Sequence, residues 1–178
     1  TGRMGGGYIR TYNNSGRETS YLGTGSDNSG QLRIYDKQGE TRSYIGDGYL
    51  QAYNQFGERT IFLGTGTNGG GYLRTYNFSG QESIYVGTGA DSSGQIRIYD
   101  NSGETGSFLG SGYFRTYNKF GKLTTFIGNA SDGGGYLRTN NKFETETVFL
   151  GTNNANEGLI NLNDKFGQSF WIRLNKKN

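Results

Sequence analysis

The 178-residue sequence contains no cysteine, no histidine and no proline. Without cysteine the chain has no disulfide framework and no thiolate metal site. Without histidine it lacks the side chain that most often serves as a general base or a metal ligand near neutral pH. We therefore expect no enzymatic activity and no bound metal or cofactor.

Apolar residues are also scarce, at 31% of the chain, with a mean hydropathy of -0.75. No run of 18 apolar residues exists, so we expect neither a thick core nor insertion into a membrane. The chain nevertheless has 14 tyrosines, 11 phenylalanines and a net charge of only +3, whereas disordered chains have few aromatics and a high net charge. The composition predicts an ordered protein, and a charge this small is not typical of a nucleic-acid-binding protein.

The chain is built from an internal repeat of two short strands around a turn of the form Asn/Asp-x-x-Gly, as in residues 71–87. Successive turns begin 23 or 18 residues apart, and Tyr12, Tyr76 and Asn140 mark a longer period of 64 residues. The difference in length falls in the connectors between units, as expected of a repeat protein. The eight turns begin at Asn13, Asp36, Asn54, Asn77, Asp100, Asn118, Asn141 and Asp164, and their glycines are Gly16, Gly39, Gly57, Gly80, Gly103, Gly121 and Gly167.

Each unit predicts strand, turn and strand. Because side chains alternate along a strand, Leu73 and Thr75 face one side, while the residues of the Tyr-x-Arg-x-Tyr pattern face the other. The second strand ends in an aromatic and an aliphatic residue before a glycine, as in 85–87, so we expect this end to be buried on both faces, through contact with another sheet or another chain. Asn or Asp opens the turn by accepting bonds from the backbone ahead, and glycine closes it by adopting a positive φ.

Three all-β architectures fit eight such strand-turn-strand units. A single-chain β-solenoid would stack the arginines of successive units at about 4.8 Å, which like-charge repulsion disfavours. An antiparallel meander of hairpins doubles that spacing but leaves a thin sheet uncovered. Three chains wrapped into an elongated β-fibre would cover the sheets and close their edges, and we favour this intertwined homotrimer.

We expect two segments along the chain. Residues 1–158 form the repeat array, which starts within a repeat because residues 1–8 align with residues 65–72. Residues 159–178 form a divergent last repeat and a terminal cap, since end repeats differ where stacking stops. The alignment also suggests that the chain is a piece of a longer array.

The motif at residues 94–104, Gly-Gln-Ile-Arg-Ile-Tyr-Asp-Asn-Ser-Gly-Glu, resembles the glycine-rich repeat regions of bacterial surface proteins and phage tail fibres, where LYDxxGxxxxxLG units recur. The resemblance covers residues 1–174. It implies an elongated and often trimeric structure located outside the cell, on a cell surface or on a virion. The stretch from Tyr12 to Arg17 is also similar to the YD repeats of bacterial toxins, and the 23-residue period is similar to that of MORN repeats.

Three sets of residues are candidate sites. Tyr72, Arg74, Tyr76 and Trp171 provide aromatic and guanidinium planes on which sugars can stack, although cross-strand packing explains the same Tyr/Arg pattern. Asp27, Asp91 and Asp132 lie in glycine-rich connectors and offer oxygen ligands for Ca²⁺, although turn chemistry also explains them. Glu144 and Glu146 have the spacing of an acid pair, and a solvated strand edge is the simpler interpretation.

These observations favour a structural protein, namely a fibre or stalk segment of an extracellular or virion appendage that assembles with further copies of itself. The alternative is an adhesin or lectin-like array that holds surface polysaccharide.

Overall fold

The computed structural model describes residues 6–67, 69–131, 133–152 and 157–172, with only the backbone described at residues 170–172. Over these residues the protein is all-β, and no helix that could cross a membrane is found among them. The strands are β1 (Tyr8–Tyr12), β2 (Glu18–Thr24), β3 (Gly30–Tyr35), β4 (Thr41–Gly46), β5 (Tyr49–Tyr53), β6 (Arg59–Thr65), β7 (Gly71–Tyr76), β8 (Glu82–Thr88), β9 (Gly94–Tyr99), β10 (Thr105–Gly110), β11 (Tyr113–Tyr117), β12 (Leu123–Asn129), β13 (Gly135–Asn140), β14 (Glu146–Thr152), β15 (Gly158–Asn163) and β16 (Ser169–Ile172).

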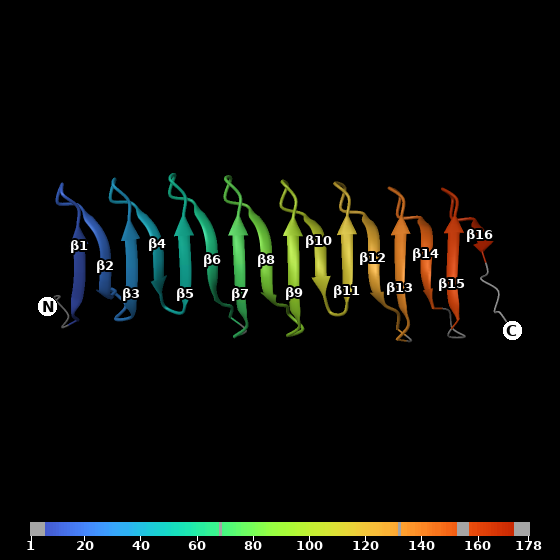
Figure 1. Cartoon of the computed structure of the whole chain (residues 1–178), viewed down its shortest axis with the longest axis horizontal. Helices are drawn as coiled ribbons and strands as arrows, with labels where there is room; N and C mark the ends of the chain where they lie inside the picture. The colour runs from blue at the N-terminus through green and yellow to red at the C-terminus, as the bar shows by residue number, and fades with distance from the viewer. Residues whose placement is uncertain (1–5, 68, 132, 153–156, 173–178) are drawn as a thin grey trace. The chain divides into compact units, whose positions relative to one another are not determined.

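The strands fall into two compact units, Thr1–Ser92 with β1 to β8 and Ser93–Asn178 with β9 to β16. In each unit every strand pairs with the next one along the chain in an antiparallel meander, which forms an open single-layered sheet (Figure 1). The predicted all-β repeat is therefore confirmed. A segment boundary at residue 158 remains a prediction.

The Asn/Asp turns join the two strands of each repeat along one edge of each sheet, the upper edge in Figure 1. In all eight turns the first residue's side-chain Oδ1 accepts hydrogen bonds from the backbone N–H groups two and four residues ahead, at 2.8–3.2 Å. The fourth residue has a positive φ in each, and it is glycine in seven turns and Glu144 in the eighth. This is the geometry of a hairpin turn closed by a left-handed residue.

The connectors along the opposite edge explain the two repeat lengths. The short ones are two-residue loops, Asp47-Gly48 and Ser111-Gly112, in which both residues have positive φ. This pattern defines a type I′ hairpin, whose twist matches that of the flanking strands. The longer connectors form a wider turn. In the connector between β2 and β3, for example, the N–H of Gly25 donates to the Ser29 carbonyl at 2.7 Å.

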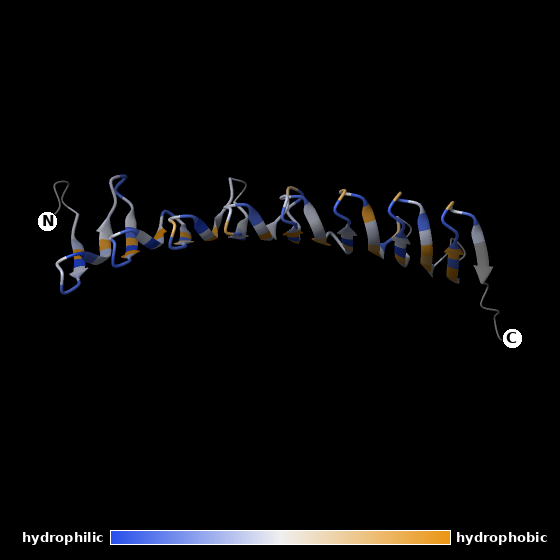
Figure 2. Ribbon diagram, turned by 90° about the horizontal axis from the view of Figure 1, so that it is seen from above, coloured by the Kyte–Doolittle hydropathy of each residue, from blue (hydrophilic) through white to orange (hydrophobic). Residues whose placement is uncertain are grey.

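The register places two kinds of side chain in separate rows on the two faces of each sheet. On one face arginines alternate with aromatic residues: in unit 1 the cross-strand row is Arg10, Tyr21, Arg33, Tyr44, Gln51, Phe62, Arg74 and Tyr85. Because an aromatic ring separates successive arginines, the meander avoids the like-charge column of a stacked solenoid. Figure 2 shows hydrophobic and hydrophilic positions alternating along the strands.

The glycine after an aromatic-aliphatic pair is required by close neighbours, which in most repeats include the ring two residues before it. At Gly64, for example, an added Cβ would lie 2.8 Å from Cε1 of Phe62 and 2.8 Å from Cβ of Tyr49. Real Cβ atoms do not approach other atoms this closely, so a side chain here would displace the ring. The aromatic ring thus packs directly against the backbone of the glycine.

Aromatic rings lying over these glycines stack into a ladder that takes the place of a conventional core. In unit 1 the centroids of Tyr49, Phe62, Tyr72 and Tyr85 follow one another at 5.1–5.8 Å. In unit 2 the corresponding ladder has its closest step at 4.7 Å, between Phe126 and Tyr136. Phe126 is 6% exposed and is the one buried large apolar side chain within the described part of the chain. A thick core is absent from this part, as the composition predicted.

Candidate interaction surfaces

The arginine-aromatic face contains three of the four residues predicted to bind a ligand, and all three lie on β7. The guanidinium carbon of Arg74 lies 4.7 Å from the ring centroid of Tyr72 and 5.5 Å from that of Tyr85. Arg59 covers Tyr76 at 4.6 Å, and Arg74 forms an ion pair with Glu82 at 3.4 Å. Cation–π contacts and cross-strand ion pairs of this kind stabilise a sheet without a ligand.

Packing therefore accounts for the positions of Tyr72, Arg74 and Tyr76. Tyr72 stacks between Phe62 and Tyr85, so its ring faces are already in contact with neighbours. Trp171 belongs to β16 in the other unit, and its side chain lies outside what the structure describes. Binding of polysaccharide through these four residues remains a prediction.

The opposite face of each sheet has a continuous apolar row with one side chain from every strand whose side chains are described. The apolar row of unit 1 is Ile9, Leu22, Leu32, Ile45, Leu50, Leu63, Leu73 and Val86, and that of unit 2 is Ile96, Leu109, Phe114, Ile127, Leu137, Leu150 and Ile160.

Much of the apolar row is open to solvent in the single chain. Ile9, Leu22, Leu63 and Val86 are between 38% and 63% exposed, and the row lines an open groove of about 860 Å³ in unit 1. The aromatic-aliphatic end of each repeat was predicted to be buried on both faces through contact with another sheet or chain; in the single chain its aliphatic side is exposed, so that burial remains a prediction. The aromatic side is half-buried because its rings stack on one another, whereas no second layer covers the aliphatic side.

A second row runs beside the apolar row toward the turn edge and is more polar. In unit 1 it consists of Thr11, Ser20, Ile34, Ser43, Ala52, Ile61, Thr75 and Ile84. The strongly apolar strip on this face of unit 1 is therefore narrow, one to two side chains wide.

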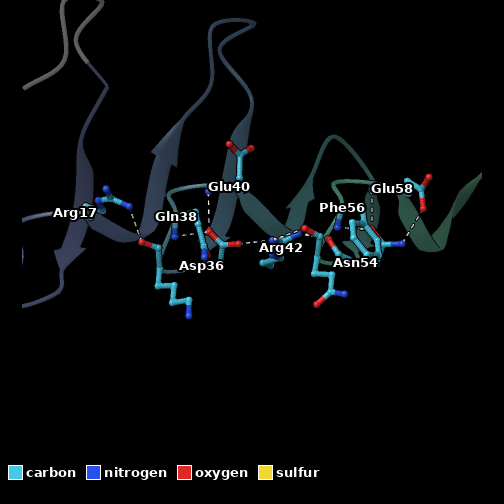
Figure 3. A network of polar contacts seen from close by, with 10 residues as sticks. Arg17, Asp36, Gln38, Glu40, Arg42, Asn54, Phe56 and Glu58 are labelled. Carbon is cyan, nitrogen blue, oxygen red and sulfur yellow. Dashed lines mark hydrogen bonds and ion pairs between the residues drawn. The ribbon is translucent and has the colours of Figure 1, made fainter. Parts of the chain in front are cut away.

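The turn edge of unit 1 is held together by polar contacts between successive turns (Figure 3). Arg17 donates to the Lys37 carbonyl at 2.9 Å, and Arg42 bonds to Asp36 and to the carbonyls of Asn54 and Gln55. Partial burial favours the protonated form of Asp36, but hydrogen bonds from the Glu40 N–H and from Arg42 outweigh it, so the pKa of Asp36 lies below its usual value. These bonds fix the first turn relative to the second and the second relative to the third.

The turn edge also exposes phenylalanines, which the sequence analysis did not single out. Phe56, Phe120, Phe143 and Phe166 occupy the third position of their turns and are between 70% and 76% exposed. The signal was present in the sequence, since other repeats have Ser or Gln at this position, as at Ser15, Gln38, Ser79 and Ser102. An apolar residue that recurs at a turn tip is not explained by turn chemistry.

The acidic residues of the connectors and of the last turns have protein partners where the structure describes them. Asp27 accepts bonds from the N–H and the hydroxyl of Ser29 at 3.1 and 2.8 Å, and Asp132 lies outside the described residues. Glu144 pairs with Lys122 at 2.9 Å, and Glu146 accepts a bond from Asn163 at 3.4 Å. No group of three or more acidic residues that could hold a metal ion is found within the described ranges.

No family model matches the sequence, and no curated protein matches it significantly. Among solved structures, a chain of a mutant Tc holotoxin pore of Photorhabdus luminescens is similar, with 13% identity and a TM-score of 0.26. The match covers 88% of this chain and 12% of that one. A TM-score this low gives no basis for transferring a fold or a function.

Proposed function

We propose that this protein is a structural segment of a fibre or stalk on an extracellular or virion appendage, and that copies of the chain assemble through their apolar rows. The observation that carries the proposal is the exposed apolar row on each single-layered sheet. Stable domains bury such a face against a second layer, and soluble monomers rarely leave a long apolar strip uncovered. A further copy of the same sheet presents the same chemistry.

Three chains around one axis suit the shape of this strip. The apolar row is flanked toward the turns by a row in which Thr, Ser and Ala are interspersed with Ile34, Ile61 and Ile84, so the part of each sheet that needs to be shielded from water is at most two side chains wide. Three narrow strips facing an axis would make a slender shared interior that needs few apolar residues per chain, in line with the low apolar content. The length of such an assembly would be proportional to the number of repeats along each chain.

Single-cysteine variants test burial of the apolar row, because the natural chain has no cysteine. We expect Leu63→Cys, in the apolar row, to react with a maleimide at least about tenfold more slowly than Phe56→Cys, at a turn tip. In the single chain these positions are 50% and 76% exposed, so a monomer would label both quickly. Equal rates in buffer, matching those in denaturant, would contradict assembly through the apolar row.

A further inference from the structure

The last three turns of unit 2 share a composition that no other turn has. Each contains lysine at its second position and phenylalanine at its third: Lys119-Phe120, Lys142-Phe143 and Lys165-Phe166. The three rings are 70%, 74% and 73% exposed. We call these six residues the Lys–Phe edge.

Each lysine of the Lys–Phe edge lies over its own phenylalanine. The distances from Nζ to the ring centroid are 5.1, 4.9 and 4.8 Å. A cation–π contact of this kind is weak at an exposed site, and it leaves most of each ring in water. Each of the three turns therefore exposes an ammonium group and an apolar ring side by side to solvent.

The three turns are also joined to one another, so the edge is a continuous surface. Lys122 bonds to Glu144 across the first two turns at 2.9 Å, and Asn141 donates to the Lys165 carbonyl across the last two at 3.2 Å. Two hairpin steps of about 10 Å each give a row roughly 20 Å long. The nearby carboxylates are engaged: Glu144 pairs with Lys122, and Asp164 accepts backbone bonds from Phe166 and Gln168. Both carboxylates keep their negative charge, but they are outnumbered by the four lysines of these turns, Lys119, Lys122, Lys142 and Lys165, so the edge has a net positive charge.

We propose that the Lys–Phe edge binds the surface of a lipid bilayer that contains anionic headgroups. The rings are pure hydrocarbon and lie exposed at the turn tips, so they suit a partner into whose surface they can insert. A bilayer interface is such a partner, because apolar side chains gain free energy on entering it and lysines gain further from anionic lipids. A polysaccharide would instead require hydrogen-bond acceptors as well as donors around the rings, whereas the lysines that cover these rings supply donors only and phenylalanine supplies neither. The contact is peripheral and needs no segment that crosses the bilayer.

The chain itself supplies substitutions that its turns tolerate. Ser15 and Ser102 occupy the position of the phenylalanines in other turns, and Asn14 and Asn101 occupy that of the lysines. The test variants are therefore the triple changes Phe120→Ser/Phe143→Ser/Phe166→Ser and Lys119→Asn/Lys142→Asn/Lys165→Asn. The matched control is Phe56→Ser/Phe78→Ser in unit 1, which removes two turn phenylalanines that are 76% and 85% exposed and have no lysine beside them in sequence.

Co-sedimentation with vesicles measures the binding. We expect the natural chain to bind vesicles of phosphatidylcholine with 30% phosphatidylserine, to bind pure phosphatidylcholine vesicles much more weakly, and to lose affinity as salt is raised. Each triple change should weaken binding to the anionic vesicles at least about 30-fold, whereas the control should change it less than about twofold. Circular dichroism and light scattering should show the same fold and the same mass for all variants, so that this result is independent of the proposed assembly.

Three outcomes would overturn the assignment: no binding to anionic vesicles, binding that neither triple change weakens, or an equal loss in the unit 1 control. Retention on an immobilised acidic polysaccharide that requires the same six residues, without vesicle binding, would assign the edge to a different partner.

Discussion

The ring of Phe126 lies against Gly128, so that a Cβ added to this glycine would be 3.0 Å from Cζ of the ring and 2.5 Å from Cβ of Tyr113. Phe126 is also the most buried large side chain described. A similar contact with the preceding ring recurs at Gly23, Gly46, Gly64, Gly110 and Gly151, and it makes the glycine a packing residue.

We expect Gly128→Ala to lower the free energy of unfolding by about 1–3 kcal/mol, because both Tyr113 on the neighbouring strand and the ring of Phe126 must shift to admit the methyl group. Gly135→Ala is the matched control, since Gly135 also lies in a strand and an added Cβ there meets nothing within 4 Å. Urea denaturation followed by circular dichroism measures both variants. A loss at Gly135 as large as that at Gly128 would show that the effect comes from the backbone and not from the ring.

Glu144 adopts a φ of 65° at the turn position where the other seven repeats have glycine. A residue with a side chain is strained in this region by roughly 1–2 kcal/mol, whereas the ion pair with Lys122 is exposed to solvent and contributes little. We therefore expect Glu144→Gly to raise the free energy of unfolding by about 0.5–1 kcal/mol. Glu144→Gln keeps the strain and loses the ion pair, so it should be slightly destabilising. A destabilising Glu144→Gly would mean that the ion pair outweighs the strain.

The turn at Asp100 predicts a dependence of stability on pH. Hydrogen bonds from the hydroxyl and the N–H of Ser102 lower the pKa of the Asp100 carboxyl. A lowered pKa in the folded state means that the carboxylate's contribution is fully present above its unfolded pKa, near about 3.9, and is lost as the pH falls through the folded value.

We expect Asp100→Asn to keep the turn, because asparagine occupies this position in five other repeats, and to remove this acid-dependent contribution. The difference in unfolding free energy between the natural chain and Asp100→Asn should therefore shrink as the pH is lowered from 5 to 2. Asn13→Asp is the reverse test, since Asn13 accepts the same pair of bonds from Ser15, and it should add an acid-dependent loss. Parallel pH profiles for all three proteins would contradict this account.

Much of the fold could be predicted because its determinants are local. The eight Asn/Asp positions were predicted from a four-residue motif, and the side-chain alternation of residues 72–76 was predicted from strand geometry alone. The glycine after each aromatic-aliphatic pair was interpreted only as the end of a repeat. Its packing role depends on where a ring two residues earlier lies, and on the register with the next strand, which a one-dimensional pattern does not give.

The candidate surfaces were predictable only in part. The alternation predicted an aliphatic face that a meander leaves uncovered, and Leu63 and its neighbours are exposed in the single chain. The Lys–Phe edge was missed because its six residues come from three turns, and only the meander brings these turns together. What covers the apolar row depends on other molecules, and no local pattern in one chain specifies it.

The central claim is that the apolar rows are buried between copies of the chain, and a mass measurement in solution tests it most directly. Multi-angle light scattering on a sizing column should give three chain masses for the natural protein, in an elongated particle. The variant Leu50→Thr/Leu63→Thr/Leu73→Thr, which introduces into the apolar row the threonine that the second row already contains, should dissociate to one chain mass. The matched change Tyr12→Thr/Tyr53→Thr on the opposite face should leave the trimer intact. A natural chain that elutes as a compact monomer at all concentrations would contradict the account.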